Sequence, residues 1–386
     1  MAGNGKPPVL VVVQLSGGND FMNTLIPYNS PIYWDCRPVV NVPEDTIIPL
    51  NDELGFHPKT APLKEMFDEG NVALIQGIGY PNSNRSHFRA MDIWHTCEPD
   101  TVSTTGWLGQ AIRDLDPDGE NVLTGVNLGR GLPRAMTAPG VPVASVGDLD
   151  GYGVMTSITD QRERDEALEI FKRMYGPAFG TGMVMDYLAQ TGGDVLKGAD
   201  RLSEAPAKYK SDVEYANNPF AKSLKDAARI HLADLGTRIL YVAHGGYDTH
   251  AAENPTQPVL LDELSTGISD FFDDLRAHDA ADEVVMFVFT EFGRRMKDNG
   301  SGTDHGTGGG AFIIGDRVKG GLYSEYPPLD PAQWEHGEDL KHTIDFRGIY
   351  GTLLEQWMSL EAPSIVKGHF EQIDVFADNR QPTPID

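Results

Sequence analysis

Short apolar runs, rich in β-branched residues, recur along the whole chain. They occupy residues 9–15, 72–76, 239–243, 284–290 and 312–314. Nearly continuous apolar runs of this length are typical of strands that are buried on both faces of a parallel sheet. Residues 262–275 and 344–357 instead repeat apolar side chains at helical spacing. Because such strands and helices alternate, the pattern predicts an α/β fold whose mostly parallel central sheet is covered by helices on both faces.

The stretch between about residues 150 and 220 has a different character. It is polar and charged, with a helical pattern at residues 162–172, and it ends in a loop-like segment at residues 204–219. A chain of 386 residues is long enough to form one large α/β core. We therefore interpret the stretch as a helical insertion or cap within a single domain that spans residues 1–386.

The charge balance narrows the class of partner. The chain has 31 basic and 57 acidic residues and a net charge of −26. Nucleic acid binds through basic side chains that neutralise its phosphates, so this balance argues against nucleic acid and against anionic membranes. The apolar runs are also too short for insertion into a membrane. The simplest role of the negative surface is solubility.

The N-terminus and the cysteines leave alternatives open. Residues 1–8 contain neither an apolar signal segment nor a twin arginine, although a removed export signal would leave the same sequence. The chain is thus compatible with the cytoplasm as written and with the periplasm after export. Cys36 and Cys97 could form one disulfide, but nothing in their spacing favours it.

Three of the predicted strands run into loops that carry acidic residues or histidine. These residues are Asp20, Asp248, His250 and Glu291. In open α/β sheets, ligands bind beyond the carboxyl ends of the strands. Carboxylate and imidazole groups are also common ligands of divalent metal ions. The positions therefore predict a metal site at this edge of the sheet.

Each of these positions also has a structural explanation. Asp20 follows a Gly-Gly turn and could bond its own backbone there. The Asp-x-His pair could be an ordinary polar turn after a strand. Glu291 directly follows an apolar strand and needs a partner, because an unpaired buried carboxylate is costly. That partner could be a metal ion, or Arg294 or Arg295 in an ion pair.

A glycine-rich loop at residues 302–308 adds Asp304 and His305. The many glycines suggest a backbone held close to a ligand, although a flexible surface loop would have the same composition. A phosphate-binding loop is one alternative, but the absence of a Gly-Lys-Ser/Thr ending argues against a nucleotide-binding loop. Asp304 could orient the imidazole of His305 as a supporting hydrogen-bond partner.

Ser86 precedes an apparent helix and is flanked by Arg85, His87 and Arg89. It could be the helix N-cap. It could instead be a nucleophile at a helix N-terminus, where backbone N–H groups favour an anion and arginines add charge-assisted hydrogen bonds. A Ser-His-Asp triad is conceivable, but the chain has no Gly-x-Ser-x-Gly motif, which argues against an α/β-hydrolase.

The order and spacing of several motifs resemble the DUF1501 family over nearly the whole chain, except at about residues 150–220. The motifs are Gly17-Gly18-Asn19-Asp20, Gly79-Tyr80-Pro81-Asn82, Arg85-Ser86-His87-Phe88-Arg89, Met91-Asp92-Ile93-Trp94, Thr105-Gly106-Trp107-Leu108-Gly109, Tyr247-Asp248-Thr249-His250, Thr290-Glu291-Phe292-Gly293-Arg294-Arg295, Gly302-Thr303-Asp304-His305-Gly306, Val318-Lys319-Gly320-Gly321-Leu322-Tyr323 and Asp345-Phe346-Arg347.

DUF1501 is grouped with the alkaline-phosphatase superfamily, and this resemblance implies a three-layer α/β/α sandwich. It also implies metal ions, with zinc expected before magnesium, manganese or calcium. One metal would be shared by Asp20, Ser86 as nucleophile and Glu291. A second metal would be bound by Asp248, His250 and His305, which resemble the superfamily's ligands for it.

The sequence departs from the superfamily pattern in three places. Phe292 follows Glu291 where a histidine is usual, so His87 or Asp304 could complete a metal site. Asp248 and His250 are closer together than is usual for the second metal. Cys97-Glu98-Pro99 matches only the start of the sulfatase motif that forms formylglycine, which argues against that type of sulfatase.

Together these features predict a metal-dependent hydrolase of small phosphate esters or related oxyanion esters, sulfates among them. Ser86 would attack, and Arg89 would balance negative charge on the substrate oxygens. If a metal-bound water attacked in place of Ser86, His87 or Asp304 would be its base. The alternatives are a non-catalytic member that binds a metal or an anion, and a serine esterase that uses Ser86 without metal.

Overall fold

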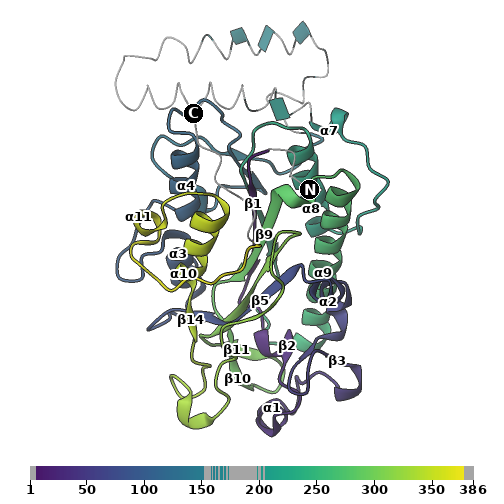
Figure 1. Ribbon diagram of the computed structural model, residues 1–386, viewed down its shortest axis with the longest axis vertical. Helices are drawn as coiled ribbons and strands as arrows, with labels where there is room; N and C mark the ends of the chain where they lie inside the picture. The colour runs from purple at the N-terminus through teal and green to yellow at the C-terminus, as the bar shows by residue number, and fades with distance from the viewer. Residues whose placement is uncertain are drawn as a thin grey trace.

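The computed structural model describes residues 6–151 and 205–377, together with a few positions between residues 158 and 202. Within them, nine strands form one central sheet (Figure 1). These are β1 (Val9–Ser16), β5 (Val72–Gly79), β6 (Gly125–Leu128), β7 (Ala144–Ser145), β8 (Ile239–Gly245), β9 (Val284–Thr290), β12 (Gly309–Ile314), β13 (Gly321–Tyr323) and β14 (Ile344–Asp345). All five predicted apolar runs are therefore strands of the sheet.

The strand order is β13-β5-β12-β9-β1-β8-β6-β7, and β14 also pairs with β5. Only β12 runs against its neighbours β5 and β9, and the other described pairings in this sheet are parallel. The prediction of a mostly parallel sheet is confirmed. Because β12 is reversed, the loop that precedes it lies at the same edge as the loops that follow β1, β8 and β9. This edge gathers the candidate residues.

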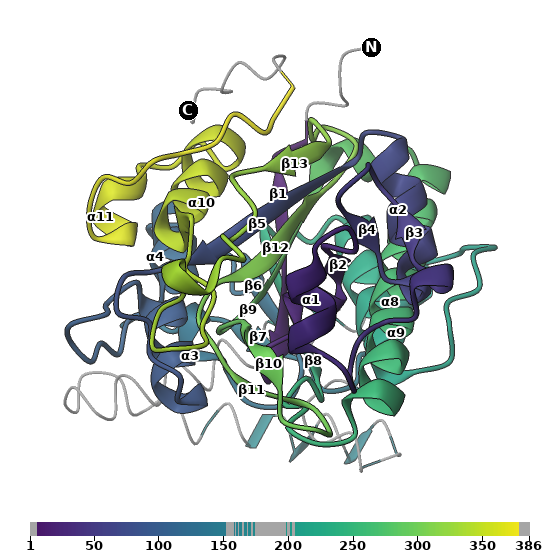
Figure 2. The ribbon, with the colours of Figure 1, turned by 90° about the horizontal axis from the view of Figure 1, so that it is seen from below.

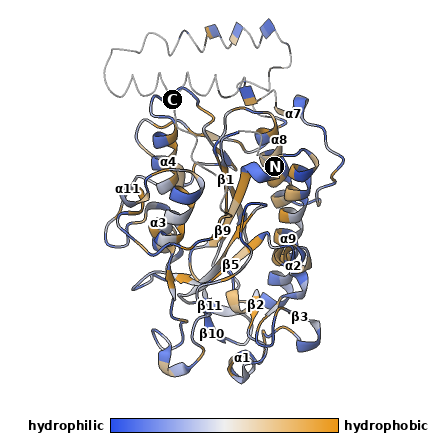
Figure 3. Ribbon diagram, in the orientation of Figure 1, coloured by the Kyte–Doolittle hydropathy of each residue, from blue (hydrophilic) through white to orange (hydrophobic). Residues whose placement is uncertain are grey.

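Helices cover both faces of the sheet, as Figure 2 shows. One layer contains α2 (Ala61–Asp68), α8 (Pro219–Leu232) and α9 (Glu253–Ala277), and the other contains α3 (His87–Thr96), α4 (Trp107–Leu115), α10 (Phe346–Thr352) and α11 (Ala362–Val366). Side chains of β1 alternate between the two layers, since Val11 packs with the first and Val12 with the second. This double burial explains why the run is almost entirely apolar. Figure 3 shows the central strands largely in the orange of hydrophobic residues.

The two predicted helices fare differently. Residues 262–275 lie inside α9. The prediction of a helix over 344–357 is wrong at its start, because Ile344 pairs with Ile78 in the sheet. Helix α10 begins at Phe346, where the Asp345 side chain accepts a hydrogen bond from the backbone N–H of Arg347 at 3.0 Å. A short π-helix, Leu353–Trp357, completes the segment.

Smaller elements surround the edge of the sheet that carries the site. They are α1 (Pro31–Cys36), a sheet of β2 (Leu25–Ile26), β3 (Ile48–Pro49) and β4 (Gly55–Phe56), and a hairpin of β10 (Arg294–Asp298) and β11 (Thr303–His305). Short 3-10 helices fall at Phe21–Asn23, Glu44–Thr46, Pro58–Thr60, Arg134–Met136, Ala281–Glu283 and Pro331–Gln333. Cys36 and Cys97 are free thiols.

The predicted insertion at about residues 150–220 lies largely outside the described residues. Its described end includes the short helix α7 (Ala205–Lys208) and the start of α8. Among the described residues, no helix has both the length and the apolar character needed to cross a bilayer.

Candidate functional site

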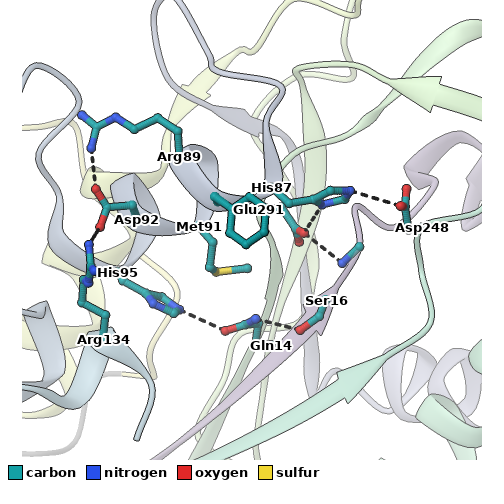
Figure 4. A pocket seen from close by; sticks show the side chains of 12 residues that line it. Gln14, Ser16, His87, Arg89, Met91, Asp92, His95, Arg134, Asp248 and Glu291 are labelled. Carbon is teal, nitrogen blue, oxygen red and sulfur yellow. Dashed lines mark hydrogen bonds and ion pairs between the residues drawn. The ribbon is translucent and has the colours of Figure 1, made fainter. Parts of the chain in front are cut away.

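Four loops and element ends meet beside the carboxyl ends of β1, β8 and β9. They bring together side chains that are far apart in the sequence, and Figure 4 shows part of the group. Its members are His87, Asp248, His250, Glu291, Asp304 and His305. The structure thus joins the loop after β8, the end of β9, the β10–β11 hairpin and the first turn of α3.

Asp248 lies at the centre of this cluster. Its Oδ1 atom is 3.1 Å from Nε2 of His250 and 3.0 Å from Nε2 of His305. Its Oδ2 atom is 3.3 Å from Nε2 of His87. The Nε2 atoms of His250 and His305 are themselves only 2.9 Å apart. Three imidazoles therefore direct the same ring nitrogen toward one carboxylate.

The other ring nitrogen of each histidine determines where its proton resides. Nδ1 of His305 lies 2.8 Å from the carbonyl oxygen of Arg85, which can only accept a hydrogen bond. Nδ1 of His250 faces Asp304 Oδ1 at 3.0 Å, and Nδ1 of His87 faces Glu291 Oε1 at 2.9 Å. In the neutral state each proton is thus on Nδ1, which leaves the Nε2 lone pairs pointing at Asp248.

Lone pairs and a carboxylate at such distances repel one another unless a cation lies among them. A proton could fill this role, and so could a metal ion. The ligand atoms of His87, Asp248 and His305 lie within 4.8 Å of one another and form a group that could hold a metal ion. Nε2 of His87 is buried and has no hydrogen-bond partner within the described part of the chain. The arrangement of these side chains is therefore better suited to binding a cation than to hydrogen bonding among themselves.

The pKa shifts follow from the same contacts. For Asp248, burial would raise the pKa, but the neighbouring His305 imidazole and the Arg294 guanidinium outweigh it and hold the pKa well below its usual range. The hydrogen bond to Glu291 raises the pKa of His87. Burial lowers the pKa of His305. Asp248 is therefore an anion at neutral pH, as a metal ligand must be.

Arg294 holds the loops of the cluster in place. Its guanidinium is fully buried and donates to Asp248 Oδ1 at 2.9 Å. It also donates to the carbonyl oxygens of Gly17, Gly18, Tyr247 and Thr303. Gly17 has a positive φ of 125°, and a Cβ there would lie 2.3 Å from the backbone nitrogen of Asp248. The Gly-Gly turn is thus needed because the loops after β1 and β8 touch.

Glu291 supports the cluster without an arginine partner. It is buried, and its Oε1 atom accepts hydrogen bonds from His87 Nδ1 and from the backbone N–H of Gly17, both at 2.9 Å. Arg294 pairs with Asp248 instead, and Arg295 pairs with Glu338 and Asp339. The alternative of an ion pair between Glu291 and either arginine is therefore wrong.

Asp20 belongs to a different network. Its side chain is buried and forms an ion pair with the fully buried Arg37. Its Oδ1 atom also accepts from the backbone N–H of Met22 at 3.2 Å, as the turn explanation expects. Burial would raise the pKa of Asp20, but Arg37 outweighs it and lowers the pKa. Asp20 thus has a permanent cation of its own, and no contact joins it to the three histidines of the cluster.

Ser86 is exposed and precedes α3 as its N-cap residue, but its side chain makes no capping hydrogen bond. Its backbone N–H donates to Asn84 Oδ1 at 2.8 Å. Arg89 lines the cavity, yet its guanidinium donates to Asp92 and to the carbonyl oxygens of Glu98, Pro99 and Thr101. Arg89 thus has structural contacts of its own, and its expected contact with substrate stays a prediction.

A cavity of about 770 Å³ opens beside the cluster and is lined by His87, Asp248 and Glu291. Its floor also includes Gln14 and Ser16 at the end of β1, which the sequence analysis missed. The available signal was Gln14, a polar side chain between the apolar Val13 and Leu15 of β1. The volume of this cavity lies in the range of small-molecule sites.

Comparisons with known proteins give a family and a distant fold likeness. A family model described as "Protein of unknown function (DUF1501)" matches residues 75–358. The solved structure of a protein in the alkaline phosphatase superfamily from Vibrio parahaemolyticus is 11% identical, with a TM-score of 0.41 over 94% of this chain and 69% of that chain. A phosphonate monoester hydrolase of Agrobacterium radiobacter is 10% identical, with a TM-score of 0.41 over 94% and 78%.

A third structure, the PsFucS1 sulfatase from Pseudoalteromonas sp., is 11% identical, with a TM-score of 0.40 over 96% of this chain and 71% of that chain. No curated protein sequence matches the chain. At this distance the similar structures assign no activity.

Proposed function

The chain belongs to the DUF1501 family, and from its site we propose that it is a metal-dependent hydrolase of small phosphate esters or related oxyanion esters. The observation that supports this most is the convergence of three imidazole Nε2 atoms on one Asp248 carboxylate. The metal ligands are His87, Asp248, His250 and His305. Three nitrogen donors favour zinc over magnesium or calcium, which prefer oxygen.

A divalent ion bound there would act as a Lewis acid on the ester oxygens of the substrate. The protein groups around it perform distinct tasks. Glu291 and Asp304 hold the protons of His87 and His250 on Nδ1, so that Nε2 stays available. Arg294 fixes Asp248 from the buried side. The adjoining cavity receives the substrate.

Ser86 is the proposed nucleophile because it adjoins His87 at the first turn of α3. Its side chain has no capping bond, so its hydroxyl is not committed to the helix. Ser86→Ala should abolish turnover, while Ser86→Thr should keep part of it because a hydroxyl remains. If the alanine variant turns over at the wild-type rate, Ser86 is not the nucleophile, and an activated water is the attacking group.

The test of the function combines metal analysis with a substrate panel. Purified protein should contain zinc and hydrolyse at least one of p-nitrophenyl phosphate, bis-p-nitrophenyl phosphate and p-nitrophenyl sulfate. A chelator should remove the activity, and zinc should restore it. His250→Ala and His305→Ala should lose both metal and turnover, whereas His369→Ala, on the exposed surface, should lose neither.

Two results would count against the proposal. Bound metal without turnover of any ester would favour a non-catalytic binding protein. Turnover that persists in a chelator would favour a serine esterase. The first result leaves the ligand assignment standing, and the second removes it.

A further inference from the structure

A second cavity, of about 720 Å³, lies beyond the ends of β6 and β8. Gln14 and His95 line both cavities, so the two adjoin at these side chains. Apolar surface comes from Leu132, Pro133 and Phe220, and polar groups come from Ser223 and Glu263. The size is again that of a small-molecule site. Nothing in the proposed chemistry uses this space.

The shared wall is polar. Gln14 Nε2 donates to Ser16 Oγ at 2.7 Å on the side of the metal cluster. Gln14 Oε1 accepts from the hydroxyl of Tyr241 and lies 3.0 Å from His95 Nε2 on the other side. Figure 4 shows Gln14 between Ser16 and His95. A substrate that spans both cavities would therefore cross a hydrogen-bonding wall.

Arg130 lines the second cavity on a turn that is firmly held. Asn127 Nδ2 donates to the carbonyl oxygens of Gly129 and Gly131, at 3.3 and 2.7 Å. Ser145 Oγ lies 3.0 Å from each of the same two oxygens. The backbone on both sides of Arg130 is thus fixed by side chains of β6 and β7. This restraint lowers the entropy that the turn would lose when a ligand binds.

The charge of Arg130 is not balanced by the part of the chain that the structure describes. Arg130 is exposed and makes no ion pair or hydrogen bond with any described residue. By contrast, Arg134 on the same loop pairs with Asp92. The carboxylate in this cavity, Glu263, is 3.1 Å from His244 and already has that partner. A free guanidinium in a cavity is an anion-binding group.

We propose that this second cavity binds an acidic group on the leaving portion of the substrate, and that Arg130 recognises it. The substrate would then carry two anionic groups, one at the metal cluster and one at Arg130. The inference rests on the proposed function, because the first group is the ester that the cluster is proposed to bind. It makes Arg130 a specificity residue with no part in bond cleavage.

The test uses phosphonates, which bind without being hydrolysed at an ester bond. A series of ω-carboxyalkyl phosphonates of increasing length is compared by calorimetry with alkyl phosphonates of equal length, on the zinc-loaded protein. At the length that spans the cavities, the carboxylate should improve affinity about tenfold, since a charge-assisted hydrogen bond contributes at least that much. Arg130→Gln should remove this gain, and Arg130→Lys should retain part of it. Arg113→Gln, at an exposed arginine of α4, should retain all of it.

The outcomes separate the two proposals. If alkyl phosphonates bind and the carboxylate adds nothing at any length, the inference about Arg130 is wrong and the proposed function stands. If the gain persists in Arg130→Gln, another group recognises the carboxylate and the inference is again wrong. If no phosphonate binds, the proposed function fails and the inference fails with it. A carboxylate gain that depends on Arg130 but not on zinc would support the cavity and contradict the metal.

Discussion

Two groups of charged side chains lie at the same edge of the sheet and differ in one respect. The network of Asp20, Arg37 and Glu253 contains its own cation, since Arg37 pairs with Asp20 in the interior. Asn23 and Thr303 donate to Glu253, at 3.2 and 2.7 Å. The cluster around Asp248 has three imidazoles whose lone pairs point inward, and its central carboxylate is 47% exposed.

The same sheet topology gathers carboxylates in both groups, but their charge is balanced in different ways. Loops after neighbouring parallel strands place carboxylates side by side in both groups. Where the chain also supplies a buried arginine, the carboxylate is neutralised and becomes part of the structure. Where it supplies imidazoles instead of an arginine, the negative charge is available to a ligand. The comparison therefore predicts that the first group determines stability and the second determines binding.

Removing Arg37 should have the largest effect on stability. Arg37→Met leaves Asp20 and Glu253 buried without a cation and deletes the bonds from Arg37 to the carbonyl oxygens of Arg295 and Met296. Breaking a buried ion pair in this way costs about 3–5 kcal/mol of unfolding free energy. Urea denaturation measures the loss. Arg113→Met, at an exposed arginine, should stay within about 0.5 kcal/mol of wild type.

A loss below about 1 kcal/mol for Arg37→Met would contradict the comparison, because it would mean that the buried Asp20 carboxylate does not need the positive charge of Arg37.

Metal should stabilise the protein through the second group alone. Zinc at about 100 times its Kd should raise the unfolding free energy by about 2.7 kcal/mol. The increase should disappear in His250→Ala and persist in Glu253→Gln, as measured by denaturation with and without a chelator. An equal increase in His250→Ala would remove this histidine from the ligand set.

The support of His250 by Asp304 should have a smaller effect. Asp304→Ala removes the acceptor of the His250 Nδ1 proton and should weaken zinc affinity about 10–100-fold. Asp304→Asn keeps an acceptor oxygen, so its zinc affinity should lie between those of wild type and Asp304→Ala. Competition with a chromophoric chelator gives these affinities. Stability without metal should be unchanged in both variants, since Asp304 is about half exposed.

Much of the fold and part of the candidate site could be predicted from the sequence. The sheet and its parallel strands follow from apolar runs, because a strand buried on both faces cannot alternate. Asp248, His250 and His305 could be proposed together because they flank strand ends. The reversal of β12 explains why a loop before a strand joins loops that follow strands, and no periodicity predicts that reversal.

Asp20 was placed by the same rule and lies elsewhere. The rule locates the end of a strand but does not indicate which long side chain reaches back to it, and Arg37 does so from the end of α1. His87 is expected either to complete a metal site or to act as a base, and its Nε2 faces Asp248. Glu253 had no signal at all, because an acid at a helix start is ordinary. Partners fixed by tertiary contacts were thus beyond the pattern.

Glu253 gives the finest test of the difference between the groups. Burial, together with the nearby Asp20 charge, raises its pKa from 4.5 to about 9, so it keeps its proton at neutral pH in the folded chain. A group whose pKa is raised on folding stabilises the fold fully below its unfolded pKa, and this contribution is lost as pH rises to the folded value. The window is therefore from about pH 4.5 to about pH 9. The pKa of Asp20 is lowered, so its own contribution is lost only at pH values below this window.

Glu253→Gln keeps the shape of the side chain and one of its two acceptor oxygens, and it removes the titration. In chelator-treated protein, the unfolding free energy of wild type should fall more steeply with pH than that of the variant, by up to about 1.4 kcal/mol per pH unit. The histidines of the cluster titrate equally in both proteins and cancel in this difference. Parallel pH profiles would mean that Glu253 is ionised in the folded chain. Arg37 would then face two charged carboxylates, so the network around Asp20 would not be neutralised by its own cation. The difference from the cluster around Asp248 would disappear.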